Sequence, residues 1–279
     1  MIKKYFLDPL PDDLNARRAV IETSLISSLF YLAFTLFAVY LSASNQSDAL
    51  LRFTRDDGVV EWLQFLLYFS VSVFVMFSLY AHLIKDQNKL FSLPALGMLA
   101  VIALFFFGAM EEISWGQRLV GRETNAFFAQ FNRQNETNLH NLVVNGVSIN
   151  RLVFGKILFF IIFFHNLILP ILAVNKKKLT EVVNVKLGGC YPPIVLSVFY
   201  IVGAILVELI AHERRKELLE LIGGVHYLSM VFLAYGLGFQ IKNPIFSGKN
   251  ALLASRAFTV ILLLFWGLAW CLSVSVRTC

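Results

Sequence analysis

FSLPALGMLAVIALFFFGAM, residues 91–110, carries no charged side chain and runs directly into EEISWGQR, residues 111–118. A helix crosses the ~30 Å hydrocarbon core of a bilayer with about 20 consecutive apolar residues, and the first stretch supplies such a run. Two adjacent carboxylates at the end of such a helix are costly next to hydrocarbon, and ionisable groups there usually serve a function. The stretch therefore predicts a membrane-spanning helix that ends in a polar site.

The composition of the whole chain is also that of a membrane protein. Of its 279 residues, 58% are hydrophobic and 15% are charged, and the mean hydropathy is +0.70. Soluble domains are about 45–50% apolar and about 25% charged, so the sequence predicts an all-α integral membrane protein. The net charge of +6 is attributed to basic residues that flank the spans and face anionic lipid, and nucleic acid is not an expected partner.

Further apolar runs predict a bundle of about seven transmembrane helices in one domain, residues 1–279. In the fourth run Pro170 is expected to kink or loosen the helix, because proline has no N–H to donate. In the sixth run Gly223 and Gly224 are expected to let neighbouring helices approach closely. The predicted spans are about residues 19–41, 59–84, 91–113, 152–174, 191–211, 218–241 and 251–276.

The longest polar section, residues 116–150, lies between the third and fourth spans. Within it Phe127, Phe128 and Phe131 recur at helical spacing, which predicts a short interfacial helix on the membrane surface. Basic residues at the N-terminus and at Lys176–Lys178 favour a cytoplasmic N-terminus, because cytoplasmic loops carry an excess of Lys and Arg. With seven spans, residues 116–150 would then lie on the extracytoplasmic side.

Glu111 and Glu112 are the first candidate catalytic residues. They are about 100° apart on a helix, so that one faces the bundle while the other faces its rim. Trp115 and Arg118 follow Glu111 at i+4 and i+7, and they are predicted to share its helical face and to bind substrate. The alternative is an interfacial ion pair between a glutamate and Arg118, with Trp115 in the aromatic belt.

His140 is the third candidate catalytic residue, because histidine is the usual acid–base group near neutral pH. Glu136 and His140 stand at i and i+4 if their segment is helical, and Asn141 beside them is a candidate substrate-binding residue. The alternative is that these side chains cap a helix or order the loop.

The segment between the fifth and sixth spans repeats the Glu-x-x-x-His spacing at Glu208 and His212, and Glu217 and Glu220 follow at i and i+3. Glutamate and histidine from several helices can hold Zn, Mn or Fe, and Glu220 is also a candidate for substrate binding. The alternative is a solvated cap of internal ion pairs with the basic residues 214–216. No particular cofactor is identified, and a divalent metal stays open. The metal-ligand candidates are Glu112, His140, Glu208 and His212.

Three polar residues, His165, Asn166 and His226, fall inside the predicted spans. Such residues are most often hydrogen-bonded in the interior of a helix bundle rather than ligands. In a transporter they would lie along the transport path.

EEISWGQR at residues 111–118 and NETNLHN at residues 135–141 resemble the signature of a widespread, uncharacterised family of bacterial multi-pass membrane proteins. The resemblance covers roughly residues 111–142 and, less closely, residues 217–224. It implies a protein of the bacterial inner membrane and supports the choice of site residues, and it implies no reaction.

Three functions are open from the sequence. The first is a membrane hydrolase or transferase that acts on a lipid or lipid-linked substrate by carboxylate and histidine acid–base chemistry or with a metal. The second is a proton-coupled transporter or channel, but polar residues concentrated at one face count against it, because a transport route needs them at the midplane and on both sides. The third is a non-catalytic subunit or sensor. The oligomeric state is not predicted.

Overall fold

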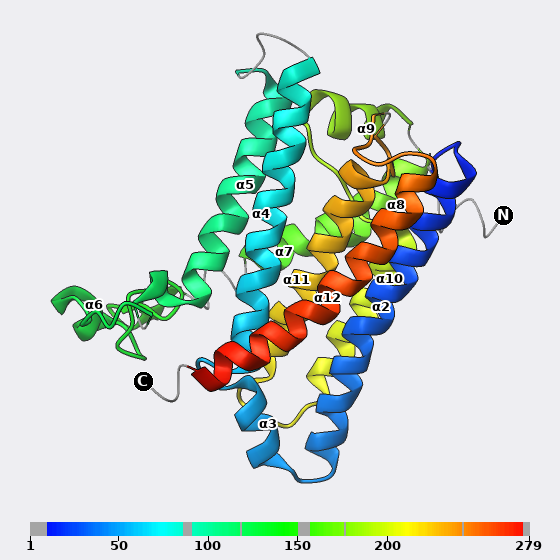
Figure 1. The fold of residues 1–279 in the computed structure, drawn as a ribbon. Helices are drawn as coiled ribbons and strands as arrows, with labels where there is room; N and C mark the ends of the chain where they lie inside the picture. The colour runs from blue at the N-terminus through cyan, green and yellow to red at the C-terminus, as the bar shows by residue number, and fades with distance from the viewer. Residues whose placement is uncertain are drawn as a thin grey trace.

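The computed structural model of the chain is almost entirely helical (Figure 1). It describes residues 10–85, 91–117, 119–149, 157–175, 177–241 and 243–275. Within these ranges five helices are long and apolar enough to cross a membrane, which confirms the prediction of an all-α protein with several apolar spans. The five are Leu14–Ala43, Ser47–Ile84, Leu93–Glu112, Arg215–Gly236 and Lys249–Ser275.

The predicted count of seven spans is not confirmed. Two shorter apolar helices, Leu158–Ala173 and Ile194–Glu208, lie where the fourth and fifth spans are predicted. Their described parts fall short of the length that a crossing needs. Residues 152–156 of the fourth predicted span lie outside the described residues.

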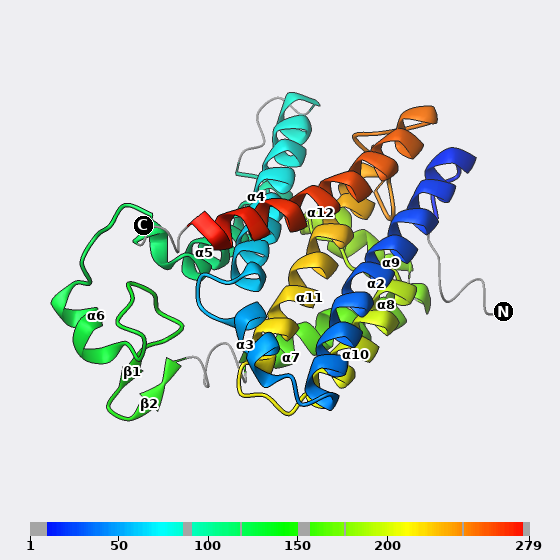
Figure 2. The same ribbon diagram turned by 60° about the horizontal axis from the view of Figure 1, so that its bottom comes forward.

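The long helices pack side by side, and α12 lies obliquely across α2 and α4 (Figures 1 and 2). The helical elements are α2 (Leu14–Ala43), α3 (Ser47–Thr54), α4 (Val59–Lys85), α5 (Leu93–Glu112), η1 (Ser114–Gly116), α6 (Ala126–Phe131), α7 (Leu158–Phe163), η3 (Phe164–Ile168), α8 (Leu169–Asn175), α9 (Lys177–Glu181), η4 (Val182–Lys186), α10 (Ile194–Glu208), α11 (Arg215–Val231), η5 (Phe232–Gly236) and α12 (Lys249–Ser275).

Helix α4 packs against α5, α11 and α12. Its buried face is a stripe of aliphatic residues four positions apart, as expected for a helix against a core. Gly224 on α11 lies against this face, because a Cβ there would come within 3.1 Å of Leu67 Cβ. The predicted close approach is therefore confirmed for Gly224. The fully buried residues of the stripe are Leu63, Leu67, Val71 and Val75.

The fourth apolar segment is irregular ahead of Pro170. The five residues of η3 form a π-helical turn, and α8 resumes at Leu169. Because Pro170 has no N–H, an uninterrupted α-helix would leave the carbonyl of Asn166 without its usual donor. The predicted loosening thus takes the form of a π turn directly before the proline, and both π turns and prolines are usual sites of helix irregularity.

Residues 119–149 form an end lobe that projects to the side of the bundle from the end of α5 (Figures 1 and 2). It contains α6, as the phenylalanine spacing predicts, and a small hairpin of β1 (Val143–Val144) and β2 (Val147–Ser148) that was not predicted. Asn145 and Gly146 make the hairpin turn with φ of 51° and 77°. Asn-Gly between apolar residues is a strong signal for such a turn.

Candidate functional site

A left-handed turn separates α5 from the end lobe. Ser114, Trp115 and Gly116 have φ angles of 48°, 56° and 74°, and a left-handed conformation costs about 1–2 kcal/mol for each non-glycine residue. The prediction that Glu111, Trp115 and Arg118 share one helical face is therefore wrong, because the helix ends at Glu112. Trp115 still reaches back to Glu111, and Arg118 itself lies outside the described residues.

Glu111 joins the end of α5 to the end lobe. Its Oε1 accepts the indole N–H of Trp115 at 2.8 Å. Its Oε2 accepts the main-chain N–H groups of Leu139 at 2.7 Å and of His140 at 3.0 Å. The side chain is buried, and both oxygens are engaged. The geometry therefore gives Glu111 an anchoring role, beside the catalytic role that the sequence predicts.

A second buried set of contacts holds the turn from the other side. Ser114 Oγ donates to Glu136 Oε2 at 2.7 Å, and Asn138 Nδ2 donates to the same carboxylate oxygen at 2.7 Å and to Ser114 Oγ at 3.0 Å. The interpretation of Glu136 and His140 as a helical i, i+4 pair is wrong, because residues 135–141 are not helical. Instead Glu136 stabilises the left-handed turn, which offsets part of its cost.

Three glutamates, Glu112 at the end of α5 and Glu217 and Glu220 in the first turns of α11, meet beside this turn. One carboxylate oxygen of each lies within 4.8 Å of the others. We call this set the glutamate cluster. Among the residues that the structure describes, it is the group of His, Cys, Asp and Glu side chains that lie close enough together to hold a metal ion.

Helix α4 fixes the position of the glutamate cluster through the main chain of α11. Gln64 Nε2 donates to the carbonyl of Glu217 at 2.7 Å, and the Tyr68 hydroxyl donates to the carbonyl of Glu220 at 3.0 Å. Gln64 is fully buried. Buried hydrogen bonds of this kind hold a helix at a fixed height and rotation, and so they fix where its first-turn carboxylates lie.

His140 faces the glutamate cluster from the end lobe. Its Nδ1 lies 3.5 Å from Glu111 Oε2, and its Nε2 lies 3.1 Å from the Asn141 amide nitrogen. Burial lowers the pKa of His140, but the contact with Glu111 and the charges of Glu220, Glu111 and Glu217 raise the pKa above its usual value. The imidazole is thus an electrostatic partner of the cluster, and Asn141 orients its ring.

An ion pair lies next to the glutamate cluster and joins the loop before α4 to the start of α11. Arg214 donates from its two terminal guanidinium nitrogens, Nη1 and Nη2, to the two carboxylate oxygens of Asp56, at 2.6 and 2.9 Å, and such bidentate pairs add geometric specificity. Gln134 of the end lobe donates to the same aspartate at 3.2 Å. Asp56 therefore joins the loop before α4, the start of α11 and the end lobe around the glutamate cluster.

The structure keeps two predicted metal ligands apart from the cluster. Glu208 pairs with Arg215 at 2.8 Å on the exposed surface, and exposed pairs contribute little. His212 Nδ1 accepts the main-chain N–H of Arg214 at 3.2 Å and orders a turn. The cluster includes Glu217 instead, which was not among the predicted site residues, although its i, i+3 spacing to Glu220 places both on one face.

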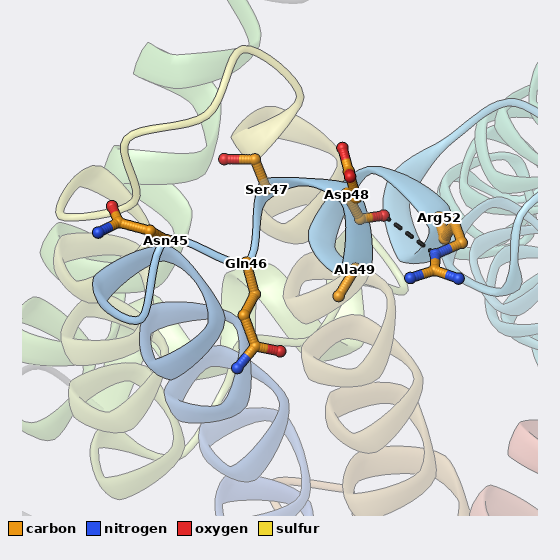
Figure 3. A pocket seen from close by; sticks show the side chains of 6 residues that line it. All are labelled: Asn45, Gln46, Ser47, Asp48, Ala49 and Arg52. Atoms are coloured by element: carbon orange, nitrogen blue, oxygen red, sulfur yellow. Dashed lines mark hydrogen bonds between the residues drawn. The ribbon is translucent and has the colours of Figure 1, made fainter.

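A shallow polar hollow of about 310 Å³ lies at the turn between α2 and α3 (Figure 3). Figure 3 shows Arg52 folded back so that its Nε donates to the carbonyl of Asp48 at 3.2 Å. The hollow shares no lining residue with the glutamate cluster, so we do not assign it to the site. Its lining residues are Asn45, Gln46, Ser47, Asp48, Ala49 and Arg52.

No protein-family profile, curated protein or solved structure matches this chain. The resemblance of residues 111–142 to a bacterial membrane family therefore stays an expectation.

Proposed function

We propose that the protein is a membrane-embedded enzyme that acts on a lipid or lipid-linked substrate at one face of the bilayer. The observation that carries the proposal is the convergence of Glu112, Glu217 and Glu220 at the ends of two apolar helices, within 4.8 Å of one another. Carboxylates this close at the edge of hydrocarbon are costly without a proton or a cation among them. A purely structural role would be filled more cheaply by neutral side chains.

The cluster and His140 supply the groups for acid–base chemistry. Glu112 would act as the general base, since Glu111 beside it is already bound to Trp115 and to the end lobe. His140 would return the proton to the leaving group, because its contact with Glu111 favours the protonated ring. Glu217 and Glu220 would orient the substrate or, with Glu112, hold a divalent ion such as Mn²⁺, Zn²⁺ or Mg²⁺ that activates water.

The end lobe would bring the substrate to the site. Phe127 contacts the rings of Phe128 and Phe131 at centroid distances of 5.5 and 5.1 Å, and Phe127 is half exposed. An apolar aromatic helix next to the end of a span suits the lipid interface. Trp115, 45% exposed, would contact the headgroup region. We place this face outside the inner membrane of a bacterium, with the N-terminus in the cytoplasm.

Substitution of Glu112 tests the proposal. Purified full-length protein would be incubated in vesicles of bacterial polar lipids that include polyprenyl-linked lipids, and products would be followed by mass spectrometry. Glu112→Gln and His140→Ala are expected to reduce turnover at least about a hundredfold. Glu213→Gln, the same change at an exposed glutamate of the loop before α11, is expected to leave turnover unchanged. Full activity of both site variants would show the proposal to be wrong.

A further inference from the structure

Two amide side chains of the end lobe, Gln134 and Asn141, are held next to each other by the main chain. Asn132 and Leu142 form an isolated β-bridge. Beside this bridge the N–H of Arg133 donates to the carbonyl of Asn141 at 3.1 Å. The N–H of Gln134 donates to the buried Asn132 Oδ1 at 2.9 Å. The two side chains are also hydrogen-bonded to each other, from Asn141 Nδ2 to Gln134 Oε1. The fold therefore keeps the two amides paired, although Gln134 is exposed.

The ion pair of Asp56 with Arg214 determines which way this amide pair is oriented. Both oxygens of the Asp56 carboxylate are bound by the guanidinium, at 2.6 and 2.9 Å, and an ionised carboxylate can only accept hydrogen bonds. Gln134 Nε2, which lies 3.2 Å from Asp56 Oδ1, must therefore be the donor. This fixes the orientation of the Gln134 amide, and its Oε1 is left to accept the N–H of Asn141 Nδ2.

The same amide nitrogen of Asn141 also faces the imidazole of His140, at 3.1 Å from Nε2. An amide nitrogen has two N–H donors and accepts no hydrogen bond. One N–H of Asn141 goes to Gln134, so the other must go to His140 Nε2, which is then the acceptor. In the neutral ring the proton is therefore on Nδ1, which lies 3.5 Å from the carboxylate oxygen Glu111 Oε2. The contacts on both sides of the ring thus agree on one tautomer.

We propose that Gln134 and Asn141 are positioning residues that keep neutral His140 protonated at Nδ1 and leave Nε2 as its reactive nitrogen. The role in turnover rests on the proposed function, in which His140 gives a proton to the leaving group. That proton would be the one on Nε2: its N–H bond breaks as the leaving group is protonated, and Nε2 later regains one proton from water. The Nδ1–H group stays with Glu111 throughout. A carboxylate that holds one imidazole nitrogen in this way leaves the other nitrogen for chemistry.

Nitrogen NMR of histidine measures the tautomer directly. The full-length protein, labelled with ¹⁵N-histidine, would be reconstituted in lipid nanodiscs at a pH at which the ring of His140 is neutral. The chain has five histidines, and the signals that disappear in His140→Gln belong to His140. The proton is expected on Nδ1 in the wild-type protein. A wild-type ring with its proton on Nε2 would overturn the proposal, and this result requires no substitution at Gln134 or Asn141.

Two opposite substitutions of Gln134 separate the direction of the hydrogen bonds from a purely structural role. Gln134→Glu keeps an acceptor for Asn141 and should keep the proton of His140 on Nδ1. Gln134→Lys presents a donor to Asn141, which must then turn its Oδ1 toward both neighbours. The ring should respond by moving its proton to Nε2, with a change of about tenfold in the ratio of the two tautomers. Gln130→Lys, the same change at an exposed glutamine of α6, should leave the ratio unchanged. The same tautomer in Gln134→Glu and Gln134→Lys would overturn the proposal.

Lipid turnover by the same variants distinguishes this proposal from the proposed function. Gln134→Lys should lower turnover by about 10- to 100-fold, and Gln134→Glu should lower it less. Gln130→Lys should have no effect. If the wild-type protein turns over no lipid, the proposed function is wrong, and the tautomer of His140 still decides whether the amide pair positions the ring. A reversed tautomer in Gln134→Lys with undiminished turnover would show that Nε2 is not the reactive nitrogen, and would overturn the proposal.

Discussion

The carboxylate of Glu111 accepts the main-chain N–H of Leu139 at 2.7 Å, and so it joins the end of α5 to a loop 28 residues further along the chain. The next residue, Glu112, takes part instead in the glutamate cluster. The two adjacent carboxylates therefore have different partners: the first holds the end lobe, and the second lies with Glu217 and Glu220. The pair makes a matched experiment, because the same substitution is possible at both positions.

Glu111→Gln is expected to loosen the end lobe. A glutamine has one acceptor oxygen, and its amide group would face main-chain donors, so that at least one of the N–H groups of Leu139 and His140 loses its acceptor. The free energy of local opening should fall by about 1–3 kcal/mol. Hydrogen exchange at Leu139 and His140 measures this change. Glu112→Gln serves as the control, and equal exchange in the two variants would contradict the difference in partners.

The left-handed turn predicts a penalty for Gly116→Ala. Gly116 has φ of 74° and open space where a Cβ would lie, so only backbone strain is added. That strain should destabilise the protein by about 1–2 kcal/mol. Gly267→Ala in α12 also meets open space, but at an ordinary helical position, where alanine is expected to stabilise by about 1 kcal/mol or less. Thermal unfolding of both variants in detergent gives the comparison, and similar midpoints would count against a strained turn.

The pKa of His140 predicts how stability depends on pH. Burial opposes the charged ring, but Glu111, Glu220 and Glu217 outweigh it and raise the pKa. A histidine whose pKa is higher in the folded than in the unfolded protein stabilises the folded state. This contribution is fully present at pH values below the unfolded pKa of about 6.5, and it is lost as the pH rises through the folded pKa. Thermal midpoints measured from about pH 5 to about pH 9 should therefore decline in this window. In His140→Gln that part of the decline should be absent, and an unchanged profile would show that His140 does not interact with the cluster.

The glutamate cluster predicts divalent metal binding. Calorimetric titration with Mn²⁺ should give a site whose affinity falls by on the order of 10- to 100-fold or more in Glu112→Gln and in Glu220→Gln. Glu208→Gln is the control, because Glu208 pairs with Arg215 outside the cluster. Loss of binding in Glu208→Gln but not in Glu220→Gln would favour the ligand set predicted from the sequence. Lipid turnover that persists in chelator without bound Mn²⁺ would assign the chemistry to acid–base catalysis alone.

The ends of the helices were predictable to the extent that local sequence determines them. The apolar run to Met110 and the two carboxylates after it indicate where α5 ends, and the structure ends it at Glu112. The left-handed turn was not predictable, because serine and tryptophan rarely adopt positive φ. Ser114 is held there by Glu136 and Asn138, more than 20 residues away in the sequence. The β-hairpin, in contrast, was readable from Asn145 and Gly146.

The composition of the glutamate cluster depends on packing rather than on spacing. The repeat of Glu-x-x-x-His drew attention to Glu208 and His212, but α10 ends at Glu208 and the following turn directs both residues elsewhere. Glu217 joins the cluster because Gln64 holds its carbonyl and thereby fixes the first turn of α11. A contact between residues 153 positions apart cannot be predicted from a single sequence.

Adjacent glycines in α11 give a final prediction about that packing. A Cβ at Gly224 would lie 3.1 Å from Leu67 Cβ and 3.3 Å from Tyr68 Cε1, whereas a Cβ at Gly223 would meet only the Tyr200 hydroxyl, at 3.9 Å. Gly224→Ala should therefore push α11 away from α4, at a cost of about 1–3 kcal/mol, and stretch the bond from Tyr68 to Glu220. Gly223→Ala should be neutral or stabilise by up to about 1 kcal/mol, because alanine favours helix. The midpoint of thermal unfolding and the affinity for Mn²⁺ should both fall in Gly224→Ala, and neither should fall in Gly223→Ala. Equal behaviour of the two variants would mean that the contact of α4 with α11 does not position the glutamate cluster.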